Sequence, residues 1–94
     1  MTPTHPPAHG VTADQIEAAL REALQPQSLT VQDDSHLHAG HAGAREGRHF
    51  SVSIRGACFN GLSHVQRHRL VYDALRELIP QGIHALAIQA EPVA

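Results

Sequence analysis

Apolar residues recur every three or four positions in the stretch that follows Val11, which is the spacing of one helix face. Thr12 and Gln15 match a capping box, in which each side chain satisfies a backbone amide of the other residue. Pro26 would end the helix, since proline has no amide hydrogen to donate. The pattern therefore predicts a helix over Ala13–Gln25 whose buried face comprises Ile16, Ala19, Leu20, Ala23 and Leu24.

Alternation of apolar and polar residues predicts three strands further along the chain. The first is the short stretch Leu29–Gln32, and the second is His49–Arg55, in which every other residue is apolar. The third, Ala85–Ile88, is too short for a helix. The same parity places His84 on the face of this strand that carries Leu86 and Ile88.

A second helix is predicted between the last two strands. Ser63 and Gln66 form another capping box, and Pro80 with Gly82 would end the helix. The expected range is His64–Leu78, with an apolar face made of Leu70, Val71, Ala74, Leu75 and Leu78.

The element order is therefore α-β-β-α-β, an α/β arrangement of the α+β kind. The first two strands should pair antiparallel, whereas the strand–helix–strand step at the end requires a parallel, right-handed crossover. The simplest packing is a three-stranded mixed sheet with both helices on one face.

Composition narrows the class of protein. The 94 residues suffice for one small core, and the seven arginines, with no lysine, face nine acids for a net charge of −2. We expect a disordered, proline-rich lead-in over residues 1–11, a single domain over residues 12–94 and no membrane span. The lone Cys58 cannot form an intramolecular disulfide, which fits a reducing compartment, so we expect a cytoplasmic protein.

The chain contains nine histidines, which are its main candidates for metal-ligating residues. His36, His38 and His41 lie in a glycine-rich segment after Asp33 and Asp34 and could hold zinc, but the zinc signal is weak and the spacing fits a solvated polar loop better. His84 stands apart at the start of a strand. It is either a partly buried histidine bonded to a carbonyl or a residue that a ligand can reach.

The sequence Arg67-His68-Arg69 places positive charge in the first turns of a helix, where the helix dipole disfavours it. The cluster either contacts an anion, such as a phosphate backbone or an acidic partner, or pairs internally with Asp33, Asp34 or Glu77. Cys58 has no neighbouring base and fits a half-buried apolar residue better than a nucleophile. Because no catalytic triad, phosphate-binding glycine motif or carboxylate pair occurs, we expect no enzyme.

Four motifs together resemble the BolA family and cover roughly Thr12 to Pro92. They are the Asp33–His41 segment with its histidines, His49-Phe50, the stretch from Phe59 to Tyr72 that contains Arg67-His68-Arg69, and Ile83–Ile88 with its His84-Ala85-Leu86 start. The resemblance implies a fold similar to a type II KH module. It also implies a monothiol glutaredoxin as partner, with a [2Fe–2S] cluster shared between the two proteins and glutathione.

In the ligand set that the resemblance implies, the glutaredoxin cysteine and a glutathione thiol supply two ligands. This chain supplies His84 and a loop histidine, His38 by its position, with His41 in reserve. A histidine-rich chain with one cysteine suits such a half-site, because cluster ligation by histidine needs thiolates from elsewhere.

The same resemblance implies a second function, transcriptional regulation of stress response and cell shape through DNA binding. Its contact surface would be Arg67, His68 and Arg69 with Gly61 and Ser63 beside them, although the net charge disfavours strong DNA binding. The same helix could instead dock the glutaredoxin or its glutathione. We expect the isolated chain to be a monomer or a weak homodimer.

Overall fold

The computed structural model of the chain describes residues 11–34 and 48–94. In chain order its elements are α1 (Ala13–Leu24), β1 (Ser28–Asp33), β2 (Arg48–Arg55), the short 3₁₀ helix η3 (Ala57–Phe59), α2 (His64–Ala74), α3 (Ile79–Gly82) and β3 (Ile83–Glu91). The predicted α-β-β-α-β order is confirmed, with η3 and α3 as additions. Residues 1–10 and 35–47, which include the predicted lead-in apart from Val11 and also the loop histidines, lie outside the described residues. Val11, predicted as the last residue of the lead-in, is instead buried in the core.

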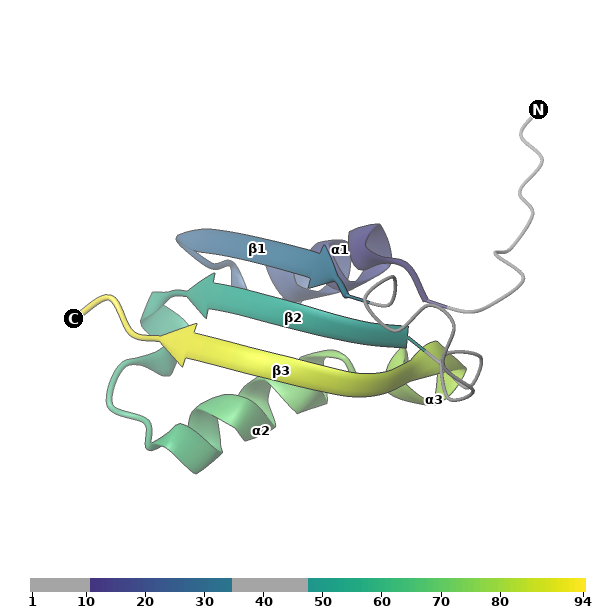
Figure 1. Cartoon of the computed structure of the whole chain (residues 1–94). Coiled ribbons are helices and arrows are strands. Elements are labelled where there is room, and N and C mark those ends of the chain that lie inside the picture. The colour runs from purple at the N-terminus through teal and green to yellow at the C-terminus, as the bar shows by residue number, and fades with distance from the viewer. Residues whose placement is uncertain (1–10, 35–47) are drawn as a thin grey trace.

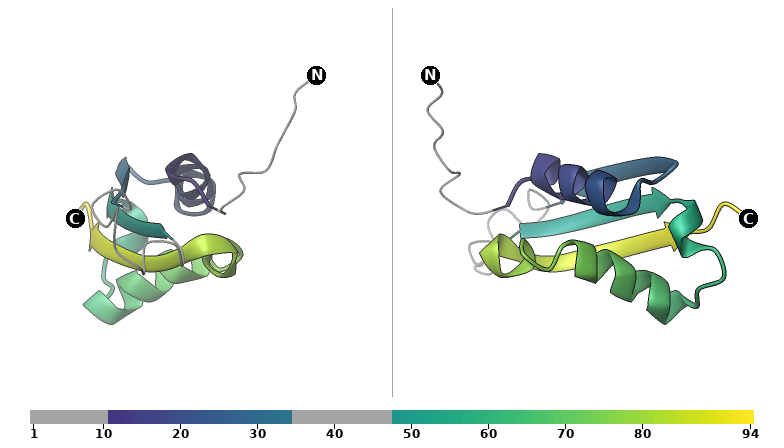
Figure 2. Two further views of the ribbon diagram at one scale, coloured as in Figure 1. Left: turned by 45° about the vertical axis from the view of Figure 1, so that its right-hand side comes forward. Right: turned by 180° about the vertical axis from the view of Figure 1, so that it is seen from behind.

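The three strands form one mixed sheet with β2 in the centre (Figure 1). β1 pairs antiparallel with β2, and β3 pairs parallel with β2, as the sequence predicted. Viewed from behind, α1 crosses the β1 side and α2 the β3 side of the same sheet face (Figure 2). The other face carries no helix among the described elements, so the site-bearing strands are open on that side.

The core lies between the helices and the covered face of the sheet. The predicted inward residues of β2, Phe50, Val52 and Ile54, are all buried, which confirms the period of two. They pack with Val11, Ile16, Leu20, Phe59, Val71, Leu75, Ile83 and Ala90.

Helix α1 begins as the sequence predicts. The Thr12 side chain accepts from the Gln15 amide at 3.2 Å, and the Gln15 side chain accepts from the Thr12 amide at 2.8 Å. The helix ends at Leu24, where Gln25 adopts a left-handed conformation with φ of 48°. The predicted range is therefore correct to within one residue.

The prediction for the second helix was wrong at its end, because α2 ends at Ala74 rather than at Leu78. Leu75 caps α2, turns follow, and the separate helix α3 starts at Ile79. A continuous helix would direct the Pro80 ring against the carbonyl of Arg76 and leave that carbonyl without a donor. Pro80 instead lies in the first turn of α3, where a missing amide hydrogen costs nothing.

Strand β3 is longer than the predicted Ala85–Ile88 and runs from Ile83 to Glu91. Its register against β2 shifts near its start, since Arg48 pairs with Ile83 whereas His49 pairs with Ala85. His84 is thus an extra residue on β3, a β-bulge of a kind that is rare between parallel strands. The bulge interrupts the alternation of side chains between the two faces of β3. The prediction that His84 lies on the same face as Leu86 and Ile88 depended on this alternation.

Candidate functional site

His84 is exposed at the bulge, and its ring stacks on the ring of His49 from the neighbouring strand. The ring centroids are 5.2 Å apart and the planes are inclined by 29°. The prediction that His84 shares the half-buried row of Leu86 and Ile88 was therefore wrong, because the extra residue resets the parity. The sequence allowed either a partly buried histidine bonded to a carbonyl or a histidine that a ligand can reach. The exposure of His84 favours the second interpretation.

Sequence reasoning placed His49 in a strand and in a family motif but did not assign it to the site; the residue is half-buried and has a further interaction within the fold. A local signal existed: His49 alternates with Phe50 and Val52, so it had to point to the opposite face of β2. The contact between His49 and His84, which are 35 positions apart, depends on the parallel register of β2 and β3, and no local pattern encodes that register.

Polar contacts fix the end of the sheet next to this histidine pair. Arg48 Nη1 lies 3.1 Å from Asp33 Oδ2 and joins the start of β2 to the end of β1. The Ser51 hydroxyl donates to the Asp34 carboxylate, and the Asp34 amide donates to the His49 carbonyl at 2.7 Å. Asp34 and Arg48, the described residues on either side of positions 35–47, are thereby held beside His49.

The predicted loop ligands His38 and His41, with their neighbour His36, lie outside the described residues. Within residues 11–34 and 48–94, no group of three or more His, Cys, Asp or Glu side chains is placed to hold a metal ion. Asp33 pairs with Arg48 instead. The described residues therefore offer His84 as one accessible donor beside His49, and a complete metal site needs ligands from elsewhere.

The basic cluster of α2 separates into residues with different surroundings. Arg67 is half-buried and donates to the carbonyls of Leu62 at 3.1 Å and Ala90 at 3.2 Å, so it joins the start of α2 to the end of β3. The alternative in which Arg67 pairs with Asp33, Asp34 or Glu77 was therefore wrong. Arg69 is exposed, and the described part of the chain gives it no ion pair.

The other residues of the predicted contact surface surround the start of α2. Ser63 caps the helix in the predicted box with Gln66, and His68 is half-buried, 5.8 Å from His64 between ring centroids. Gly61 has a φ of +78°, which favours glycine, and open space where a Cβ would be. Arg69, Ser63 and Gly61 are thus accessible together, while Arg67 serves the fold.

Cys58 lies in η3 and is half-buried. Burial raises the pKa of its thiol above the ordinary value, and a backbone hydrogen bond offsets this in part. A thiol with a raised pKa stays protonated at neutral pH and is a poor nucleophile. This supports the interpretation of Cys58 as an apolar filler.

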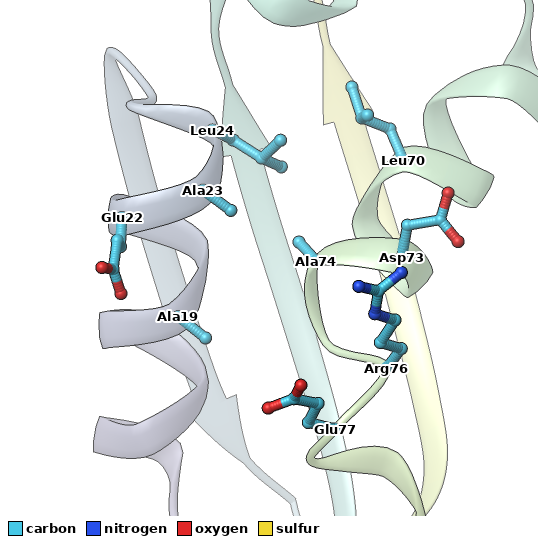
Figure 3. Close-up of a pocket in the computed structure, with 9 residues that line it drawn as sticks. All are labelled: Ala19, Glu22, Ala23, Leu24, Leu70, Asp73, Ala74, Arg76 and Glu77. Carbon is cyan, nitrogen blue, oxygen red and sulfur yellow. The ribbon is translucent and has the colours of Figure 1, made fainter.

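Two concave regions occur away from the histidine pair. A groove of about 510 Å³ separates α1 from α2, and Figure 3 shows alanine and leucine side chains from both helices along it. Its rim carries Glu22, Asp73, Arg76 and Glu77. A smaller region of about 430 Å³ lies over Ser51, Ser53, Ala87 and Gln89 of the sheet. Neither contains a histidine.

Among residues 11–34 and 48–94, no helix combines the length and the apolar character needed to cross a bilayer.

Comparison with known proteins identifies the fold's relatives. The family model for BolA-like protein matches residues 20–93. The chain is 42% identical over 80 residues to the chloroplastic protein BOLA1 of Arabidopsis thaliana, covering 81% of this chain and 50% of that protein. It is 37% identical over 73 residues to the DNA-binding transcriptional regulator BolA of Haemophilus influenzae, covering 78% of this chain and 69% of that protein.

Among solved structures, the chain is similar to the BolA domain of SufE1 from Arabidopsis thaliana. The TM-score is 0.77 at 41% identity, over 92% of this chain and 96% of that domain. The chain spans about half the length of full-length relatives such as BOLA1.

Proposed function

The chain belongs to the BolA-like family, and from that premise we propose that it is a non-catalytic partner of a monothiol glutaredoxin with which it shares a [2Fe–2S] cluster. The observation that carries the proposal is the position of His84. Its imidazole is exposed at a bulge in the sheet rather than packed in the core. The shared cluster would serve iron–sulfur trafficking or iron sensing.

The donors available in the described residues fit half of such a site and no more. His84 supplies one nitrogen, and no third His, Cys, Asp or Glu side chain in the described ranges completes a metal site with it and His49. Cys58 is half-buried with a raised pKa and is therefore unsuited to be the thiolate ligand. Thiolates supplied by a partner and glutathione, as histidine-ligated clusters require, would meet this deficit.

The residues around His84 would orient it. The stack on His49 restricts rotation of the His84 ring, and the contacts of Arg48 with Asp33 and of Ser51 with Asp34 hold the neighbouring strand ends. Neighbouring groups of this kind commonly fix the orientation of a ligating imidazole.

The second ligand in this proposal is His38, with His41 in reserve. His38 follows Asp34 by only four residues in the sequence. Because a chain advances at most about 3.6 Å per residue, the Cα atoms of His38 and Asp34 are at most about 14 Å apart. Asp34 in turn donates to the carbonyl of His49, the neighbour of His84.

The test is anaerobic cluster reconstitution of the full chain with a monothiol glutaredoxin and glutathione, followed by visible circular dichroism. We expect a mixed-complex spectrum that differs from that of the glutaredoxin homodimer and disappears in His84→Ala. Loss in His38→Ala or in His41→Ala identifies the loop ligand. His64→Ala, a histidine of α2, is the matched control and should leave the spectrum intact.

Far-UV circular dichroism of each variant separates loss of the ligand from loss of the fold. A spectrum that this protein does not alter, or one that persists in His84→Ala, would refute the proposal. His49→Ala should weaken the spectrum without abolishing it, as expected of a residue that orients a ligand.

The second candidate is a DNA-binding regulator, as the relative from Haemophilus influenzae is named. Exposed Arg69 near the start of α2, with accessible Ser63 and Gly61 beside it, favours this function. Duplex DNA binding should weaken steeply with salt, and Arg69→Ala should reduce the salt slope by about one. Arg67→Ala is a poor probe of DNA binding because Arg67 also holds the carbonyls of Leu62 and Ala90.

A further inference from the structure

Helix α2 exposes large apolar side chains on the side that faces away from the sheet. Val65 is 62% exposed and Tyr72 is 42% exposed. Both belong to α2, seven residues apart, with exposed Arg69 between them. At 3.6 residues per turn, positions i, i+4 and i+7 lie within about 60° of one another. We call Val65, Arg69 and Tyr72 the outer stripe of α2.

The outer stripe is not a misplaced part of the core. The core side of α2 is supplied by Val71, together with Leu75 at its end, and both are fully buried. Apolar residues thus lie on two sides of this helix, and only one side is covered by the fold. Two exposed apolar side chains, Val65 and Tyr72, with Arg69 between them have the composition of a contact surface. Aromatic residues and arginine are enriched at the centres of protein interfaces.

The one charged residue within the outer stripe is Arg69, which is positive although the chain as a whole is at −2. Arg67 does not add to this surface, because it donates to the carbonyls of Leu62 and Ala90. The groove between α1 and α2 is net acidic, with Glu22, Asp73 and Glu77 on its rim against a single arginine, Arg76, and Figure 3 shows Glu77 directed into it. An acidic partner would therefore be attracted to the outer stripe and repelled from the groove beside it.

We propose that the outer stripe of α2 docks an acidic amphipathic helix of a protein partner. Apolar side chains of that helix would cover Val65 and Tyr72, and a carboxylate between them would meet Arg69. Nucleic acid fits less well, since phosphates would engage the arginine but leave Val65 in water. None of the three residues belongs to the pair of His84 and His49, so this surface does not depend on cluster binding.

The chain carries its own reporter for this surface. Tyr72 is the only tyrosine, and the sequence contains no tryptophan, so intrinsic fluorescence of the protein comes from a residue in the outer stripe. Peptides without aromatic residues can be titrated against the full chain while the intensity and anisotropy of Tyr72 emission are followed.

Three synthetic helices and one duplex separate the possible occupants. The first peptide has leucines at i, i+4 and i+7 spacing and glutamates elsewhere. The second replaces the glutamates by lysines, and the third replaces the leucines by serines. A short DNA duplex is the fourth probe. We expect only the first peptide to alter Tyr72 emission in a saturable manner.

Variants then locate the binding. Val65→Ser should weaken the first peptide about tenfold, from loss of one buried apolar side chain, and Arg69→Gln about threefold, from loss of one exposed ion pair. Val93→Ser and Arg21→Gln change an exposed valine and an exposed arginine elsewhere and should have no effect. Far-UV circular dichroism confirms that each variant is folded.

Other results would overturn the proposal. Absence of binding, equal binding of the lysine peptide, or duplex binding that Val65→Ser does not weaken would each exclude an acidic helix as the occupant. Sedimentation equilibrium of the chain alone supplies one more outcome: a dimer that dissociates in Val65→Ser would assign the stripe to a second copy instead.

Discussion

The two long helices of this protein begin alike and are used differently. α1 and α2 both start with a reciprocal capping box, Thr12 with Gln15 and Ser63 with Gln66. α1 then has an acid, Asp14, in its first turn, which the helix dipole favours, and closes with an ion pair between Glu17 and Arg21. The first turn of α2 contains no acid, and its next turn is basic.

The difference continues in what each helix exposes. α1 buries Ile16 and Leu20 and turns mainly polar residues and alanines outward, whereas α2 leaves Val65 and Tyr72 exposed. The capping residues thus indicate where a helix begins, and the outward face indicates whether that helix only supports the fold or also offers a contact surface. Three predictions test this contrast.

The largest expected effect is the difference in stability between two variants, one that truncates a buried residue of α1 and one that truncates an exposed apolar residue of α2. Leu20→Ala should destabilise the protein by about 2–5 kcal/mol, because Leu20 is fully buried and a cavity remains. Val65→Ala should change the stability by less than about 0.5 kcal/mol, since Val65 is largely in water. Urea unfolding followed by far-UV circular dichroism measures both, and similar losses would contradict the contrast.

An intermediate effect should separate the two arginines of α2. Arg67→Ala should cost about 1–2 kcal/mol, because two carbonyls, those of Leu62 and Ala90, lose a charged donor. Arg69→Ala should leave the unfolding midpoint nearly unchanged, as for other exposed substitutions. Equal shifts in the two variants would mean that Arg69 also serves the fold.

The smallest effect concerns charge at the helix starts. His64→Glu should stabilise the protein by about 0.5 kcal/mol at neutral pH, because an acid in the first turn of α2 complements the dipole, and Asp14→Asn should destabilise α1 by a similar amount. Both shifts should shrink in 1 M salt, where the Debye length falls to about 3 Å. Thermal unfolding at low and high salt tests the pair, and a salt-independent shift would point to another cause.

Features with short-range signals could be predicted from the sequence. The start of α1, the inward residues of β2 and the cap at Ser63 all depend on residues within a few positions of one another. The end of α2 was predicted wrongly because Pro80 belongs to the first turn of the separate helix α3 and does not mark the end of α2, which lies six residues earlier at Ala74.

The candidate site was less predictable because its geometry depends on pairing between distant segments. His84 meets His49 only through the register of β2 and β3, and the bulge that exposes His84 has no sequence signature here. Likewise, Arg67 reaches Ala90, 23 positions later, so its role in the fold could not be separated from that of Arg69 by composition alone.

The bulge at His84 also bears on how this protein tolerates change. A chain without residue 84 could continue the regular ladder from Ile83 into Ala85. Such a deletion would favour the sheet, yet it would remove the exposed imidazole. Under the function proposed above, position 84 is where selection for folding stability and selection for cluster binding would act in opposite directions. In directed evolution for thermal tolerance alone, we expect this position to be among the first to be lost.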